Sequence, residues 1–218
     1  MTPSERKEHS EKILREKGIS INPNLPLTEE VSQIKLKSLD DICKRGIAAL
    51  LSTQIGIEVS EKRTDNLNTF IRLMEHFGVY DNLNAKESRL VNGEASQQDV
   101  IDIVWEYECY WSLLWALGIV DDITDSSKIC DCEMAIRSVS QCEDFEDFKS
   151  RCNLRSADEI MDMLDLYYRY HWAVVQHEPI DSNCSVGDLS GDVVYERRRG
   201  LEWLVCDTSD WHDISLDT

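Results

Sequence analysis

Three ionisable side chains stand in helical register with large apolar residues. Glu108 shares a predicted helix face with three tryptophans, Asp165 lies in line with Met161, and Arg197 has Val and Leu residues three and four positions away. A helix that buries its apolar stripe would carry these charges inward. Because an isolated buried charge is too costly to persist, each of them must be paired, hydrated or neutralised.

Candidate partners for these charges lie nearby in the sequence. Arg169 follows Asp165 by four residues, so the two can bridge within one helix. Arg197 could meet Glu108 from another helix through a two-pronged contact with the carboxylate. Two interpretations stay open: a buried network that fixes helix packing, or a pocket whose carboxylates have shifted pKa values. The second would be a hydrolase-type enzyme that uses Glu108 and Asp165 as a carboxylate pair in a helix-lined pocket.

Other chemical motifs are weak. Cys130, Cys132, Cys142 and Cys152 are close in sequence, yet they lack the paired C-x-x-C spacing of a zinc site. We expect ordinary reduced thiols, with a zinc site as the weaker alternative. The chain has no Gly-rich phosphate loop and no pair of Glu-x-x-His motifs, so no cofactor is predicted.

Apolar periodicity and capping signals predict the elements that would position these residues. Predicted helices cover 3–17, a segment that opens at 38, 60–77, 96–117, 156–179 and 192–205. The segment IDIVWEYECYWSLLWALG, residues 101–118, is apolar almost all round, which indicates burial on several sides. Ser156 and Glu159 form a capping box, and Pro179 ends the helix that follows them.

These elements predict an all-α protein with one compact multi-helix domain over 1–218. It would comprise an N-terminal helix and connector (1–37), a helical core (38–205) built on the buried apolar helix, and an irregular C-terminal tail (206–218). Strand signals are few, because no run of period two lies between hairpin turns.

The net charge limits the classes of partner that the protein can bind. The net charge of −19 disfavours nucleic acid and anionic membrane surfaces. It indicates either a solvated surface that keeps the protein soluble or a surface that docks a basic protein partner, and the favoured function is a soluble acidic binding protein. No apolar run approaches the roughly 20 residues that span a bilayer. The first 18 residues mix Lys and Arg with Glu, which predicts no signal peptide and a cytoplasmic location. The sequence carries no signal for the oligomeric state.

Several blocks in order resemble one protein family. These are ERKEHSEKILREKGI with LPL near the start, then EYECYWSLLWALG, RSADEIMDMLDLYYRYHWAVV, VVYERRRGLEWLV and the terminal WHDISLDT. Together they resemble the domain-of-unknown-function family DUF4272, which has no established activity. The resemblance therefore implies domain extent rather than chemistry.

The resemblance also implies a set of candidate polar-core or pocket residues, because they match the recognisable pattern of the family or lie in its blocks. They are Glu106, Glu108, Asp165, Arg169, Trp172, Glu196, Arg197, Trp203, Trp211, Asp213, Asp217 and Thr218. This chain departs from the pattern at Arg198, Gly200 and Glu202, where His, Ala and Asn are expected, and at His212, a place more often acidic. These departures disfavour a mechanism that depends on a His in either block.

Overall fold

The computed structural model describes residues 1–177 and 183–218. Over these residues it contains nine α-helices, three short 3-10 helices and no strand, which confirms the all-α prediction. Pro179, the predicted end of one helix, lies outside the described residues. The chain divides into two compact units: unit 1 comprises 1–36, 122–129 and 155–218, and unit 2 comprises 37–121 and 130–154. The single domain over 1–218 stays a prediction, and each unit is described by itself.

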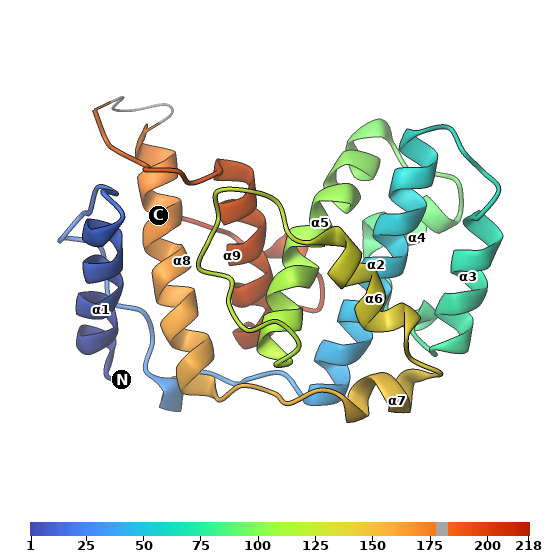
Figure 1. The fold of residues 1–218 in the computed structure, drawn as a ribbon, viewed down its shortest axis with the longest axis horizontal. Coiled ribbons are helices and arrows are strands. Elements are labelled where there is room, and N and C mark those ends of the chain that lie inside the picture. Colours follow the sequence, from blue (N-terminus) through green and yellow to red (C-terminus); the bar gives the residue numbers. More distant parts are fainter. Residues whose placement is uncertain (178–182) are drawn as a thin grey trace. The chain divides into compact units, whose positions relative to one another are not determined.

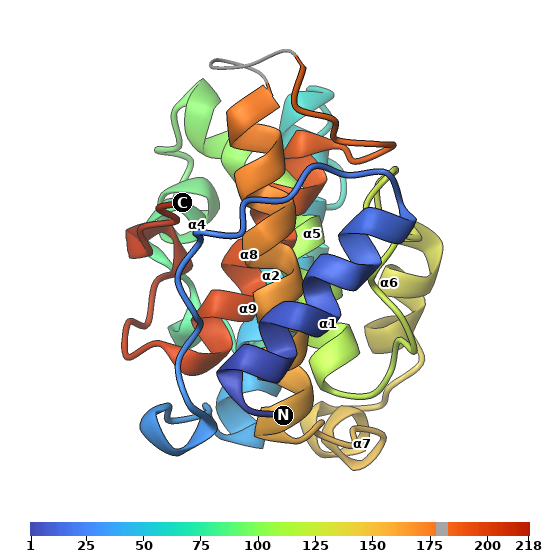
Figure 2. The ribbon, with the colours of Figure 1, turned by 90° about the vertical axis from the view of Figure 1, so that its left-hand side faces the viewer.

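Unit 1 is built on three helices, α1 (Pro3–Glu16), α8 (Ala157–His177) and α9 (Gly191–Val205). Helix α8 packs against both α1 and α9, as Figure 1 shows, and α1 crosses the face of α8 in Figure 2. The predicted capping box opens α8: the Glu159 N–H donates to Ser156 Oγ at 3.3 Å, and the Ser156 N–H donates to Glu159 Oε2 at 2.9 Å. The 3-10 helices η1 (Val31–Gln33) and η3 (Trp211–Asp213) complete the unit.

The ends of unit 1 are more firmly packed than their polar sequences suggest. Helix α1 buries Arg6 completely, although its composition predicts a surface helix. The tail is irregular apart from η3, and it is anchored: Trp211 is 1 % exposed and packs edge-on against Trp203, with ring centroids 6.2 Å apart. The Trp203 indole N–H donates to the carbonyl of Ser209 at 3.0 Å.

Unit 2 centres on α2 (Leu39–Ser60) and α5 (Gln97–Ala116), which lie side by side (Figure 1). Every residue of α5 from 106 to 116 is buried, as the all-round apolar pattern predicts. Two glycines of α2 allow the close packing: a Cβ at Gly46 would lie 3.3 Å from the Tyr110 ring, and one at Gly56 would lie 3.3 Å from Ile103. The smaller elements are α3 (Leu67–His76), η2 (Tyr80–Asn82), α4 (Ala85–Val91), α6 (Cys132–Ser140) and α7 (Phe145–Ser150).

Unit 2 corrects one sequence prediction and adds two helices. The helix predicted over 60–77 begins only at Leu67, because the chain turns at Lys62, whose φ of +57° is incompatible with a right-handed helix. Helices α4 and α6 were not predicted, since seven and nine residues give too few turns for an apolar period. Side-chain caps nevertheless open both, from Asn84 and Asp131.

Candidate functional site

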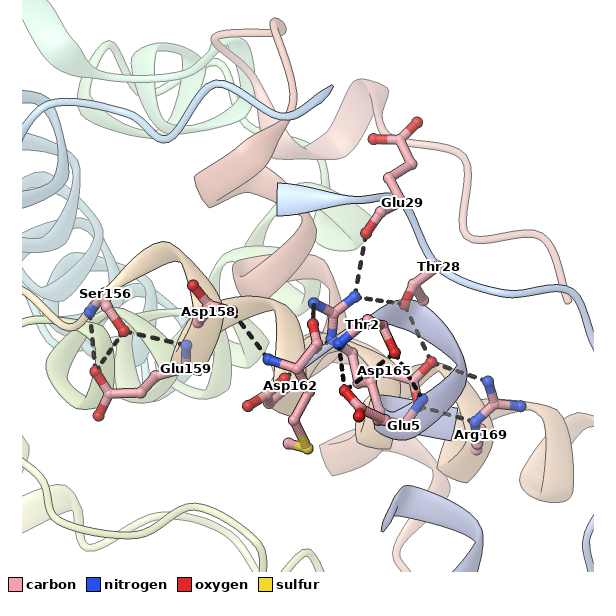
Figure 3. Close-up of polar contacts among 12 residues, drawn as sticks. Thr2, Glu5, Thr28, Glu29, Ser156, Asp158, Glu159, Asp162, Asp165 and Arg169 are labelled. Atoms are coloured by element: carbon pink, nitrogen blue, oxygen red, sulfur yellow. Dashed lines mark hydrogen bonds and ion pairs between the residues drawn. The ribbon is translucent and has the colours of Figure 1, made fainter. Parts of the chain in front are cut away.

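Asp165 and Arg169 form the predicted bridge within α8. Arg169 donates from Nε and Nη2 to the two carboxylate oxygens of Asp165, each at 2.9 Å, and both side chains are at most 2 % exposed. The Thr28 hydroxyl donates to Asp165 Oδ1 at 3.2 Å (Figure 3). Trp172 and Arg169 line one narrow space with no room for a water molecule. This pair is therefore a buried packing element.

A second arginine, which the sequence analysis missed, extends this network. Arg6 donates from Nε to Asp162 at 3.0 Å and from Nη1 to Thr28 Oγ1 at 3.2 Å and to the Glu29 carbonyl at 3.1 Å. Thr28 thus joins the two arginine–carboxylate pairs (Figure 3). The connector between α1 and α2 is held against α8 by side chains rather than by secondary structure.

Glu106 and Glu108 are buried on α5. Cys130 donates its backbone N–H to Glu108 Oε1 at 2.7 Å, and the Asn84 amide donates to Glu106 at 2.9 Å. Glu87 lies in the same polar cluster and is paired with Arg45. Burial, together with the neighbouring Glu106, raises the pKa of Glu87 to about 8.

Arg197 donates hydrogen bonds to three carbonyls of the segment 122–129. Its Nη1 donates to Ile123 O at 3.2 Å and to Asp125 O at 2.6 Å, and Nη2 donates to Lys128 O at 3.3 Å. Arg197 is 2 % exposed, so its guanidinium replaces water as the donor to these groups. The predicted contact between Arg197 and Glu108 would join unit 1 to unit 2 and stays a prediction.

The remaining polar candidates are either ion-paired within a helix or exposed on the tail. Glu196 pairs with Arg199 at 2.7 Å on α9, while Asp213, Asp217 and Thr218 are exposed. Among the described residues, no group of three or more His, Cys, Asp or Glu side chains could hold a metal ion. That search includes the four cysteines of the weak zinc alternative, Cys130, Cys132, Cys142 and Cys152, all of which are free thiols.

The carboxylates of the hydrolase alternative are buried. Asp165 is 0 % exposed and Glu108 is 1 % exposed. Neither lines the cleft described below. A substrate needs a path to the reacting carboxylates, so these observations give a hydrolase built on this pair no support.

Unit 1 contains an open cleft of about 540 Å³. The connector 26–35 forms one wall, and residues of α8, of α9 and of 205–207 form the rest. The volume falls within the range of about 300–1,000 Å³ that is typical of ligand pockets. Thr28 lines the cleft and is held by hydrogen bonds with Arg6 and Asp165. These bonds therefore also position the connector wall of the cleft.

Arg198 is the most buried charge in the cleft wall. Its Nη1 meets His171 Nδ1 at 2.5 Å, and Nη2 donates to the Asp217 carbonyl at 3.1 Å. Its Nε and Nη2 both lie 3.3 Å from Glu202 Oε1, and its guanidinium stacks on the Tyr168 ring, 4.9 Å from the centroid. Acceptors of the protein therefore surround this cation.

Two pKa shifts accompany this arrangement. Burial, followed by the charge of Arg198, lowers the pKa of His171 to about 4, so His171 is neutral at pH 7 and its Nδ1 accepts from Arg198. Burial raises the pKa of Glu202, and the nearby carboxylate of Glu29 raises it further, while Arg198 opposes both. The cleft thus holds two carboxylates near each other, Glu29 and Glu202.

His171→Gln is expected to flatten the acid side of the stability curve. Between about pH 6.5 and 4, His171 is protonated in the unfolded chain but neutral in the folded chain. The free energy of unfolding therefore falls as the pH falls through this window. A glutamine amide oxygen can still accept from Arg198. Between pH 7 and 4, the free energy of unfolding of the variant should therefore fall by up to about 3 kcal/mol less than that of the wild type, as measured by urea unfolding.

Exposed His9 provides the matched control. His9→Gln should follow the wild-type curve over the same range. Equal acid sensitivity of the His171 variant and the wild type would show that His171 does not carry the effect.

The sequence alone does not mark the cleft residues as a site. Arg198 and Glu202 were noticed only as departures from the family pattern, although their spacing of four on one helix is a signal for an ion pair. His171 carried no signal, because its partner lies 27 residues away on another helix. The connector residues came together with them only through tertiary packing.

No described helix is long and apolar enough to cross a membrane. No curated protein and no solved structure matches the chain. A family model with the description Domain of unknown function (DUF4272) matches residues 6–214, which is nearly the whole chain. The chain therefore belongs to the DUF4272 family.

Proposed function

We propose that this protein is a cytoplasmic binding protein whose cleft in unit 1 receives a basic segment of a protein partner. The observation that carries the proposal is the position of Glu202. Its side chain is 26 % exposed in the cleft wall that Glu29 also lines, and the charge of Glu29 adds to burial in raising the pKa of Glu202. A partner's ammonium or guanidinium group placed between them would relieve that repulsion.

The apolar part of the cleft suits the stem of a long basic side chain. Leu27 is 52 % exposed on the connector wall, and Ile34 and Val205 are partly exposed in the lining. Lys and Arg side chains bury their aliphatic stems along apolar surface while the charged head reaches polar groups. A segment with alternating basic and apolar residues matches this combination.

The two basic residues that line the cleft do not make it basic. Arg198 is held by His171, by two carbonyls of the tail and by one oxygen of Glu202. Lys35 is exposed, as is Asp207 on the other wall. The net charge of −19 adds long-range attraction for a basic partner and repulsion for nucleic acid.

The double variant Glu29→Gln/Glu202→Gln should weaken the binding of a short peptide of alternating lysine and leucine by about tenfold, or about 1.4 kcal/mol. Both substitutions keep the shape of the wall and remove only its charge. Isothermal titration calorimetry at several salt concentrations measures the effect. The wild-type affinity should fall as salt rises, since part of the attraction is screened.

The control removes two carboxylates outside the cleft. Glu94 and Asp81 are exposed in unit 2, so Glu94→Gln/Asp81→Asn makes the same change in net charge. This variant should bind the peptide within about twofold of the wild type, because single exposed charges contribute little. Equal weakening by both double variants would show that net charge rather than the cleft attracts the peptide.

A further inference from the structure

Two thiols from distant parts of the sequence meet in unit 2. Cys43 lies on α2 and is fully buried, while Cys152 follows α7 and is half-buried. The Cys43 S–H donates to Cys152 Sγ over 3.8 Å. Two thiols here also have carbonyl acceptors: Cys152 donates to Phe148 O at 3.4 Å, and a third thiol, Cys142, donates to Ser138 O at 3.3 Å.

The surroundings make the two sulfurs unequal. The hydrogen bond from Cys43 lowers the pKa of Cys152 although burial raises it, so a thiolate is favoured at Cys152 over Cys43. The same contact and burial raise the pKa of Cys43, which stays a thiol. Cys152 also has the greater access to solvent. A thiolate that is partly exposed beside a buried thiol is the arrangement of an attacking and a resolving cysteine.

We propose that Cys43 and Cys152 form a dithiol site that hydrogen peroxide oxidises to a disulfide and a dithiol reductant returns to the two thiols. The Cys152 thiolate attacks one peroxide oxygen, the O–O bond breaks, and the departing hydroxide takes up a proton to become water. This step leaves a sulfenic acid on Cys152. The Cys43 sulfur then attacks the Cys152 sulfur, the S–O bond breaks, and the departing oxygen leaves as a second water that includes the Cys43 proton. Two thiols are oxidised and one peroxide is reduced to two waters.

The geometry requires only a local movement. The sulfurs must approach from 3.8 Å to about 2 Å. Cys152 lies where α7 has ended and the chain is irregular, so it can move more freely than Cys43 within α2. The resulting bond would tie α2 to the end of α7 and close a loop over most of unit 2. Such a loop restricts the unfolded chain, so oxidation should raise the melting temperature.

Graded addition of hydrogen peroxide to the reduced full-length protein tests the proposal. Free thiols are blocked with N-ethylmaleimide at each step, and the peptides are mapped by mass spectrometry. We expect the Cys43–Cys152 linkage to be the first oxidation product, to lower the thiol count by two, and to disappear on addition of dithiothreitol. A different first disulfide, or oxidation of other thiols while Cys152 stays unmodified, would overturn the proposal.

Serine variants separate the two steps. Cys43→Ser keeps a hydroxyl donor beside Cys152 but cannot resolve, so a dimedone adduct should accumulate on Cys152 without a disulfide. Cys132→Ser, which removes another half-buried thiol of unit 2, should leave the linkage unchanged. Loss of the Cys152 adduct in the folded Cys43→Ser variant would contradict the assignment of Cys152 as the attacking sulfur. If that variant does not fold, the wild-type peptide map decides alone.

Discussion

Asp165→Leu is expected to lower the free energy of unfolding by about 3–5 kcal/mol, because it leaves the buried Arg169 charge without its carboxylate. Arg169 cannot release its proton, so its charge stays in this buried position. Thr28 would lose the carboxylate oxygen that fixes its hydroxyl as well. Urea unfolding monitored by tryptophan fluorescence measures the change.

The double variant Asp165→Leu/Arg169→Met is the control for this prediction. It removes both charges and keeps an apolar pair of similar volume, so it should recover most of the lost stability. Asp165→Asn, which keeps the shape alone, should be destabilised too. If Asp165→Asn instead keeps the wild-type stability and abolishes peptide binding, Asp165 belongs to a binding site rather than to a packing network.

Arg197→Met should destabilise the protein by about 3 kcal/mol through a different mechanism. Arg197 supplies donors to three carbonyls in 122–129, and a methionine of similar length supplies none. The Ile123 carbonyl keeps the Tyr167 hydroxyl as a donor, whereas the partly buried carbonyls of Asp125 and Lys128 lose theirs. Each such loss costs about 1–3 kcal/mol, less whatever water recovers. Hydrogen exchange followed by mass spectrometry should show faster exchange in 122–129 than elsewhere in unit 1.

Arg197→Lys tests the role of the planar fork. A lysine keeps the charge, but its compact ammonium cannot reach carbonyls on both sides of the segment. We expect it to recover less than half of the stability lost in Arg197→Met. Full recovery by lysine would show that charge alone, rather than the spread of donors, holds this segment.

The long helices could be predicted from the sequence because local signals agree with burial there. The apolar run around Glu108 and the capping box at Ser156 mark α5 and α8, and both begin within a residue of their predicted starts. Helices α4 and α6 have only a cap each, and the predicted helix over 60–77 ignored the turn at Lys62. Short elements depend on their neighbours, which a local pattern does not contain.

The buried charges were also predictable, because a charge on an apolar stripe must turn inward with it. Asp165, Glu108 and Arg197 are each at most 2 % exposed, and Asp165 pairs with Arg169 as the spacing predicts. The cleft was not predictable in this way. Its walls come from three distant segments, and the contact between His171 and Arg198 exists only once α8 and α9 have packed. A periodic pattern within one segment does not predict a contact between distant segments.

Chemical-shift mapping of the ¹⁵N-labelled protein during titration with the lysine–leucine peptide tests the binding proposal most directly. The proposal predicts that shifts concentrate at 26–35 of the connector and at 198–207, and that they saturate with one peptide per chain. They should vanish in Glu29→Gln/Glu202→Gln and persist in the control variant. Shifts spread over exposed acidic residues of both units, without saturation, would contradict a cleft that binds a basic segment.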